Sequence, residues 1–231
     1  MASETIYALS TAPGQAGVAV IRISGDNSKA VWETMSSHHP KPRLASLIKL
    51  SDPVDGSEID RCLGLWFPGP ASFTGEDVVE LHLHGGRAVV NGAIEALAKI
   101  SGFRPAEAGE FTRRAFNNDK LDLTEVEGLS DLIAAETEAQ RKQAIRQMDG
   151  ELSRLIDGWR DRLVRILAYL EAEIDFPDEE LDKGISDQVL HNIADLIKDV
   201  NQHLEDGHRG ERLREGFSIA IVGPPNAGKS S

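Results

Sequence analysis

The chain has 231 residues, 40% of them apolar, and its 38 acidic residues against 25 basic residues give a net charge of −13. This length allows one large domain or two modest domains with real hydrophobic cores. The acidic balance argues against a broad nucleic-acid-binding surface, so we expect any RNA contact to be local or made by a partner. No apolar run approaches the roughly 18 residues of a membrane helix, and residues 1–4 do not begin a signal peptide, so we expect no membrane segment and a cytoplasmic protein.

The sequence contains a single cysteine, Cys62, which excludes an internal disulfide. It falls within an apolar run at residues 61–67 that is typical of a strand, and no further cysteine accompanies it. We interpret Cys62 as a small buried side chain and not as a nucleophile.

Strand and helix patterns alternate over the first 118 residues. Five short apolar runs are typical of strands, and they cover residues 4–9, 17–23, 44–50, 61–67 and 78–84. Asp26 is expected to cap a helix that carries Val31 and Trp32, and a second helix is expected at residues 88–100. The alternation predicts a mixed-sheet domain at residues 1–118, within a chain of the α+β class.

From about Leu123 the pattern is purely helical. Thr124 and Glu127 fit a capping box, in which the threonine hydroxyl accepts from a backbone amide, so we expect a long helix to start there. Apolar residues then recur at three- and four-residue steps over residues 152–174 and again over residues 189–204. We interpret both stripes as core seams of a bundle, which assigns residues 119–215 to a helical domain.

Residues 223–231 fit the phosphate-binding pattern G-x-x-x-x-G-K-[ST]. In this pattern the backbone amides surround the phosphates, Lys229 reaches the β- and γ-phosphate oxygens, and Ser230 offers a hydroxyl to Mg²⁺. The apolar, β-branched run at residues 217–222 predicts the strand that delivers such a loop. Residues 216–231 are therefore expected to begin a nucleotide-hydrolysing domain with its strand and loop only. We expect the 231-residue chain alone to hydrolyse no nucleotide, because it contains neither the following helix nor a base-reading loop.

Several polar positions in the first domain indicate a ligand site. Arg22 interrupts an apolar strand, where a cation either reaches out to solvent or waits for an anion. Glu80, His82 and His84 alternate along one expected strand, so all three project from the same face. A dense run of charged and turn residues follows at residues 107–120, more than a simple connection needs.

These side chains leave three interpretations open. Imidazole and carboxylate are ordinary ligands of zinc or iron, although neighbouring positions on one strand rarely complete a metal site. Hydrogen-bonded strand residues without a ligand are the more common role of such side chains. In the third interpretation Arg22 and Lys120 hold carboxylates while Glu80 accepts hydrogen bonds from ring N–H groups, as a folate or pterin requires.

Four segments, in this order, resemble the tRNA-modification GTPase family called MnmE or TrmE. The segments are Ala12-Pro13-Gly14 with Gly17 to Gly25, Ser72 to Asp77 with His84-Gly85-Gly86, Ala108 to Phe116 with Lys120 to Leu123, and Pro225 to Ser231. The resemblance spans the whole chain. It implies a folate-binding N-terminal domain that also forms a homodimer, a helical domain, and a GTP-hydrolysing domain inserted into the helical one. Only the N-terminal half of the helical domain is then expected in this chain.

By this resemblance, Arg22, Glu80 and Lys120 correspond to the family's contacts with 5-formyltetrahydrofolate or tetrahydrofolate. The family's GTP contacts correspond to Asn226, Ala227, Gly228, Lys229, Ser230 and Ser231. Ser230 falls on the Mg²⁺ position and Asn226 on a K⁺ position. The family's C-terminal cysteine motif has no counterpart, since Cys62 does not match it, so we expect no catalytic residue in this chain.

The resemblance also implies a reaction. Family members are expected to add an aminomethyl or carboxymethylaminomethyl group to C5 of the wobble uridine, U34, in certain tRNAs. The implied requirements are a one-carbon unit from tetrahydrofolate, GTP hydrolysis, and an FAD-dependent partner, MnmG (also called GidA), in a heterotetramer. This chain alone is expected to keep folate binding and dimerisation only. The alternative is a stand-alone folate-binding module related to aminomethyltransferases, in which the phosphate loop is incidental.

Overall fold

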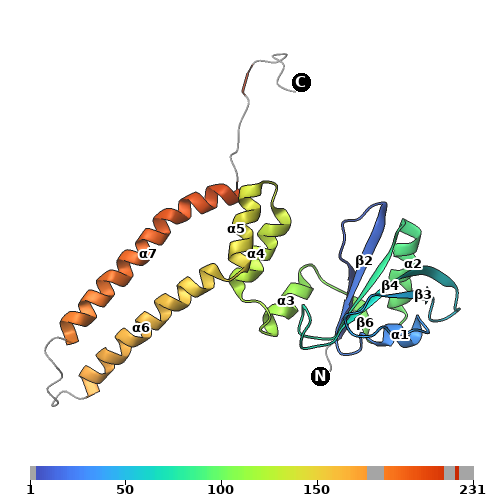
Figure 1. The fold of residues 1–231 in the computed structure, drawn as a ribbon, viewed down its shortest axis with the longest axis horizontal. Helices are drawn as coiled ribbons and strands as arrows, with labels where there is room; N and C mark the ends of the chain where they lie inside the picture. Colours follow the sequence, from blue (N-terminus) through green and yellow to red (C-terminus); the bar gives the residue numbers. More distant parts are fainter. Residues whose placement is uncertain (1–3, 176–184, 216–221, 224–231) are drawn as a thin grey trace. The chain divides into compact units, whose positions relative to one another are not determined.

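The computed structural model describes residues 4–175, 185–215 and 222–223. The chain divides into two compact units, Met1–Asp122 and Leu123–Ser231, and each is described by itself (Figure 1). Only the last residue of the expected strand at residues 217–222 and the first residue of the phosphate loop, Gly223, fall within the described residues.

The first unit is built on one six-stranded sheet (Figure 1). Its strands are β1 (Thr5–Leu9), β2 (Ala16–Ser24), β3 (Ser46–Ser51), β4 (Glu58–Phe67), β5 (Val78–Gly85) and β6 (Phe103–Pro105). They lie in the order β3-β4-β5-β2-β1-β6, and neighbouring strands are antiparallel except for β1 and β6, which are parallel. The predicted mixed sheet is therefore confirmed, although β6 has only three residues and is too short to show a period in the sequence.

Two helices pack on one face of this sheet and form the core with it. They are α1 (Ala30–Thr34) and α2 (Arg87–Ala98). The core side chains include Trp32, Leu97, Ile21, Ile23, Leu81 and Leu83. Because successive side chains of a strand point to opposite faces, the residues between these lie on the other side of the sheet. We call that side the open face, and it carries Leu47, Leu63, His82, Val20, Glu80 and Arg22.

The prediction that Asp26 caps α1 is wrong. The N-cap of α1 is Lys29, which makes no side-chain capping hydrogen bond. Backbone hydrogen bonds from Ser28 to Gly25 and from Ala30 to Asn27 turn the chain before the helix begins. The Ser28 amide, which an Asp26 cap would need, is thereby already bonded.

A helix that the sequence patterns did not predict follows β6. It is α3 (Glu110–Asn117), whose eight residues give too short a run for a helical period to stand out in the sequence. At its end the amide of Asp119 donates to Phe116 at 3.1 Å and the amide of Lys120 donates to Ala115 at 2.8 Å. This is a Schellman motif, with Asp119 in the left-handed position at a φ of 54°. The motif fixes the place where Lys120 leaves the helix.

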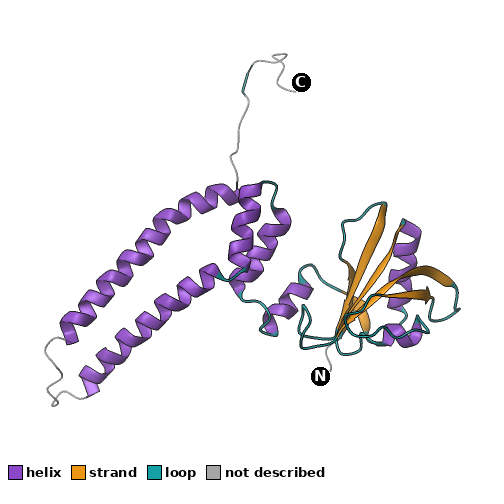
Figure 2. Cartoon of the chain, in the orientation of Figure 1, coloured by secondary structure: helices purple, strands orange, loops and turns teal. Residues whose placement is uncertain are grey.

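In the second unit all regular structure among the described residues is helical (Figure 2). The helices are α4 (Leu123–Ala134), α5 (Glu138–Met148), α6 (Glu151–Asp175) and α7 (Ile185–Glu215). The predicted capping box at Thr124 is wrong: Thr124 lies inside α4, and its hydroxyl is 2.6 Å from that of Ser153. The capping box belongs to Thr137 and Gln140 at the start of α5. None of the described helices is long and apolar enough to cross a membrane.

The two apolar stripes lie on α6 and α7. The two helices contact each other, but of the stripe residues only Ile166 and Val189 are buried. Several others are exposed, namely Leu155, Ile156, Leu163, Leu167, Leu170, Ile174, Ile197 and Leu204. The prediction of buried core seams is therefore wrong for much of both stripes, because periodicity identifies the side of a helix that is apolar and not what covers it.

Candidate functional site

The structure brings Arg22 and Glu80 together on the open face. They lie directly opposite each other on the neighbouring central strands β2 and β5. Nε and Nη2 of Arg22 both lie 2.9 Å from Oε1 of Glu80, and the side chains are 28% and 17% exposed. Among the described residues Nη1 of Arg22 makes no hydrogen bond, so this N–H pair is available to an anion.

Two aromatic rings border the Arg22 guanidinium. Its Cζ atom lies 5.2 Å from the ring centroid of Phe73 and 5.9 Å from that of Phe111. Phe73 comes from the loop before β5, and Phe111 from the first turn of α3. Such rings attract a planar cation and offer flat apolar surface beside it. Neither ring is predicted as a site residue from the sequence, although each lies within a segment that carries the family resemblance.

Lys120 reaches the same loop from the end of α3. A Cβ atom built on Gly75 would lie 3.2 Å from Cε of Lys120. The aliphatic part of the lysine side chain therefore contacts the backbone of the loop before β5, two residues from Phe73. Gly75 has a φ of 79°, which favours glycine at this position. The Lys120 ammonium forms no ion pair within the described residues. Arg22 and Lys120 thus both border the loop, and Glu80 is paired with Arg22.

The two histidines of β5 have different partners. Nε2 of His82 lies 3.3 Å from Oε2 of Glu80, whereas Nδ1 of His84 lies 2.8 Å from Oδ1 of Asp60. Within the described part of the chain no three histidine, cysteine, aspartate or glutamate side chains form a possible metal site. The predicted Mg²⁺ and K⁺ residues, Ser230 and Asn226, lie outside the described residues, as do the other predicted GTP contacts.

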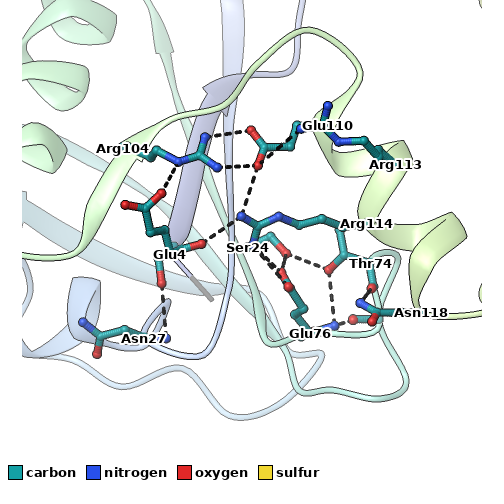
Figure 3. A network of polar contacts seen from close by, with 12 residues as sticks. Glu4, Ser24, Asn27, Thr74, Glu76, Arg104, Glu110, Arg113, Arg114 and Asn118 are labelled. Carbon is teal, nitrogen blue, oxygen red and sulfur yellow. Dashed lines mark hydrogen bonds and ion pairs between the residues drawn. The ribbon is translucent and has the colours of Figure 1, made fainter. Parts of the chain in front are cut away.

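A buried polar network joins the loop at residues 72–77 to α3 (Figure 3). Glu110, which is 3% exposed, accepts hydrogen bonds from Nη1 and Nη2 of Arg104 at 2.8 and 2.7 Å and from Nη2 of Arg114 at 3.2 Å. Hydrogen bonding from Arg104 lowers the pKa of Glu110 to about 2. Nη1 of Arg114 donates to both carboxylate oxygens of Glu76, at 3.1 and 2.9 Å. The network therefore connects β6, α3 and the loop that carries Phe73.

This cluster is suited to binding a small molecule. Two cations, a carboxylate and two aromatic rings together match a flat heterocycle that carries both N–H donors and anionic groups. Cys62 does not act as a nucleophile here, since it is 3% exposed and burial raises the pKa of its thiol to about 12.

The fold and the cluster define a class of protein in which a mixed-sheet domain with a polar site is followed by a helical domain. Known families match both parts. Residues 5–120 match the family described as GTP-binding protein TrmE N-terminus, and residues 123–218 match the MnmE helical domain. The chain belongs to the MnmE (TrmE) family of tRNA modification GTPases.

Curated relatives are similar over almost the whole chain. The tRNA modification GTPase MnmE of Parvibaculum lavamentivorans is 58% identical over 99% of this chain and 52% of its own length. The MnmE of Maricaulis maris is 55% identical over 98% of this chain and 52% of its own length. The human mitochondrial 5-taurinomethyluridine-[tRNA] synthase subunit GTPB3 is also 55% identical, over 98% of this chain and 47% of its own length. The chain spans about half the length of these relatives.

Proposed function

We propose that this chain is part of a tRNA modification GTPase and that its first unit binds a reduced folate, 5-formyltetrahydrofolate or tetrahydrofolate. The observation that carries the proposal is the Arg22–Glu80 pair, bordered by Phe73 and Phe111, in a chain of the MnmE family. The match of residues 123–218 to the MnmE helical domain favours this function over that of a stand-alone aminomethyltransferase-like module.

The residues present fit such a ligand. A reduced folate joins a pterin, with N–H groups along one edge, to a glutamate with two carboxylates. Glu80 is an acceptor for the N–H edge, Nη1 of Arg22 beside it is a donor for the neighbouring ring carbonyl, and the ammonium of Lys120 is a donor for a carboxylate. The rings of Phe73 and Phe111 offer flat surface to the aromatic part.

Titration calorimetry with 5-formyltetrahydrofolate tests this proposal. We expect the wild-type chain to bind and Arg22→Ala to bind about ten- to a hundredfold more weakly, because a hydrogen bond to a charged group contributes about 1.5–3 kcal/mol. Arg61→Ala is the matched control, since Arg61 is an exposed arginine on β4 that pairs with Glu58. The absence of binding by the wild-type chain, or equal binding by Arg22→Ala, would contradict the proposal.

The complete protein is proposed to add an aminomethyl or carboxymethylaminomethyl group to C5 of U34 in tRNA, together with the FAD-dependent partner MnmG in a heterotetramer. The names of the relatives, tRNA modification GTPase and 5-taurinomethyluridine-[tRNA] synthase subunit, support the modification of tRNA, and the second supports uridine as the base. The folate, when bound, would supply a one-carbon unit. GTP would bind at residues 226–231, with Mg²⁺ at Ser230 and K⁺ at Asn226, in a cytoplasmic protein that makes only local contact with tRNA.

We also propose a homodimer that forms through the open face of the first unit. Leu47, Leu63, His82 and Val20 form one row across four neighbouring strands. Leu47 is 71% exposed and Leu63 is 42% exposed. Neighbouring exposed leucines of this kind are typical of an interaction site, and a second copy of the same face is the proposed partner.

A further inference from the structure

The loop at residues 72–77, here called the site loop, is held from two sides. Oγ1 of Thr74, which is fully buried, lies 2.6 Å from Oγ of Ser24 on β2. The carbonyl of Thr74 accepts a hydrogen bond from Nδ2 of Asn118 at 2.6 Å. The backbone at Gly75 lies against the side chain of Asn118 as well. These contacts join the site loop to β2 on one side and to the end of α3 on the other.

Glu76 adds a charged connection to the same loop (Figure 3). Its Oε2 atom accepts a hydrogen bond from Oγ of Ser24 at 2.7 Å, and both of its oxygens accept from Arg114. Glu76 and Arg114 are only 13% and 12% exposed. Arg114 is itself held, because its Nη2 donates to Glu110 and to the carbonyl of Glu4. Charge-assisted hydrogen bonds with little access to water are strong and geometrically specific.

The Glu76–Arg114 ion pair joins the two segments that border Arg22. The site loop contributes Phe73, three residues before Glu76, and α3 contributes Phe111, three residues before Arg114. A shift of the site loop relative to α3 would therefore change the distance between the two rings. It would also move the Gly75 backbone along which the Lys120 side chain runs.

We propose that Glu76 and Arg114 are positioning residues for the folate site. Their ion pair fixes the site loop against α3 and so places Phe73 and Phe111 beside Arg22 before a ligand arrives. A site that is already ordered binds more tightly, because binding need not order it. This inference rests on the proposed function, since folate is its ligand.

The first test compares Glu76→Gln with the matched control Arg113→Gln by titration with 5-formyltetrahydrofolate. Glu76→Gln keeps the shape of the side chain and removes its charge. Arg113 lies next to Arg114 on α3, but it is exposed and its nearest carboxylate is Glu107 at 2.8 Å. We expect the dissociation constant to rise about tenfold for Glu76→Gln and to stay within about twofold of wild type for the control. A purely structural role would lower the melting temperature and the binding stoichiometry but leave the dissociation constant of the folded chain unchanged.

A second test asks whether Glu76 acts through Phe73. If it does, Glu76→Gln should weaken binding much less in a Phe73→Ala background than in the wild-type chain, because the ring that it positions is gone. Equal, additive losses in the two backgrounds would overturn the inference.

Hydrogen exchange separates this inference from the proposed function, because it needs no ligand. We expect the amides of the site loop to exchange faster in Glu76→Gln than in wild type and Arg113→Gln, while β2 stays protected in all three. Unchanged exchange in the site loop would overturn the positioning role. A wild-type chain that binds no folate would contradict the proposed function, and this exchange measurement would still decide whether the ion pair holds the site loop.

Discussion

Glu110 is a buried carboxylate that lies between two guanidinium groups. Arg104 and Arg114 both donate to it, and the hydrogen bonds from Arg104 are the main cause of its lowered pKa of about 2. The ordinary value for glutamate is 4.5. Because the folded chain favours the ionised form more than the unfolded chain does, ionised Glu110 stabilises the fold.

This difference predicts a dependence of stability on pH. The contribution of Glu110 is fully present above about pH 4.5, the unfolded value, and is lost as the pH falls towards about 2. Glu110→Gln should therefore lower the free energy of unfolding by about 3 kcal/mol at pH 7 and by progressively less below pH 4.5. Urea unfolding at a series of pH values measures this free energy. Fluorescence of Trp32 and Trp66 reports on the first unit once Trp159, which lies on α6, has been replaced by Phe. Parallel pH profiles for Glu110→Gln and the reference chain would contradict the assignment.

Residue patterns predict a face of a strand more reliably than a contact. Alternation along the strand placed Glu80 and His82 on one face, and the interruption of an apolar strand marked Arg22, but neither pattern contains the register that puts Arg22 opposite Glu80. Phe73 and Phe111 could not be found in this way. Each occurs among turn or charged residues, and the fold alone brings them to Arg22.

The Schellman motif at the end of α3 has an aspartate where glycine is preferred. Asp119 has a φ of 54°, and a side chain in this left-handed conformation meets the backbone. Aspartate tolerates the conformation better than most residues but still at a cost. The hydrogen bonds from Asp119 to Phe116 and from Lys120 to Ala115 hold it there.

Asp119→Gly should therefore stabilise the first unit. We expect a gain of about 0.5–1 kcal/mol, because the relief of backbone strain exceeds the greater entropy of glycine in the unfolded chain. Thermal unfolding should register this as a rise of a few degrees. Asp119→Ala is the control, since it removes the same charge without relieving the strain. If Asp119→Ala stabilised the first unit as much as Asp119→Gly, the loss of charge and not the relief of strain would be the cause.

The start of the helical unit shows why element boundaries were harder to predict than element types. Thr124 with Glu127 and Thr137 with Gln140 both fit the capping-box pattern, and only the second pair forms one. Thr137 has the extended backbone that an N-cap requires, whereas Thr124 lies in a helical turn. Gly150, with a φ of 73°, separates α5 from α6. A pattern of residue types does not contain these backbone angles.

Across the chain, much of the apolar surface of α6 and α7 is exposed among the described residues. The sequence periodicity correctly located the apolar sides of both helices. The periodicity does not show which side chains of a stripe are covered, and of the stripe residues in the described part of the chain only Ile166 and Val189 are buried.

The dimer proposal predicts a particle of about two chains by light scattering at micromolar concentration. Leu63→Asp should shift the particle towards one chain, because it places a charge beside the exposed Leu47 of the open face. Val54→Asp is the control, since Val54 is 77% exposed in the turn between β3 and β4. A dimer that survives Leu63→Asp would show that the open face is not the interface.

The Arg22–Glu80 pair is proposed to form the folate site, and a variant that changes both residues together tests this. Removing Arg22 alone leaves a half-buried carboxylate without its cation, so the double variant Arg22→Ala with Glu80→Gln avoids an unpaired charge. Titration of this variant with 5-formyltetrahydrofolate should give at least a hundredfold weaker binding than wild type, with the fold retained. Tight binding that survives both changes would place the folate site elsewhere and contradict the account.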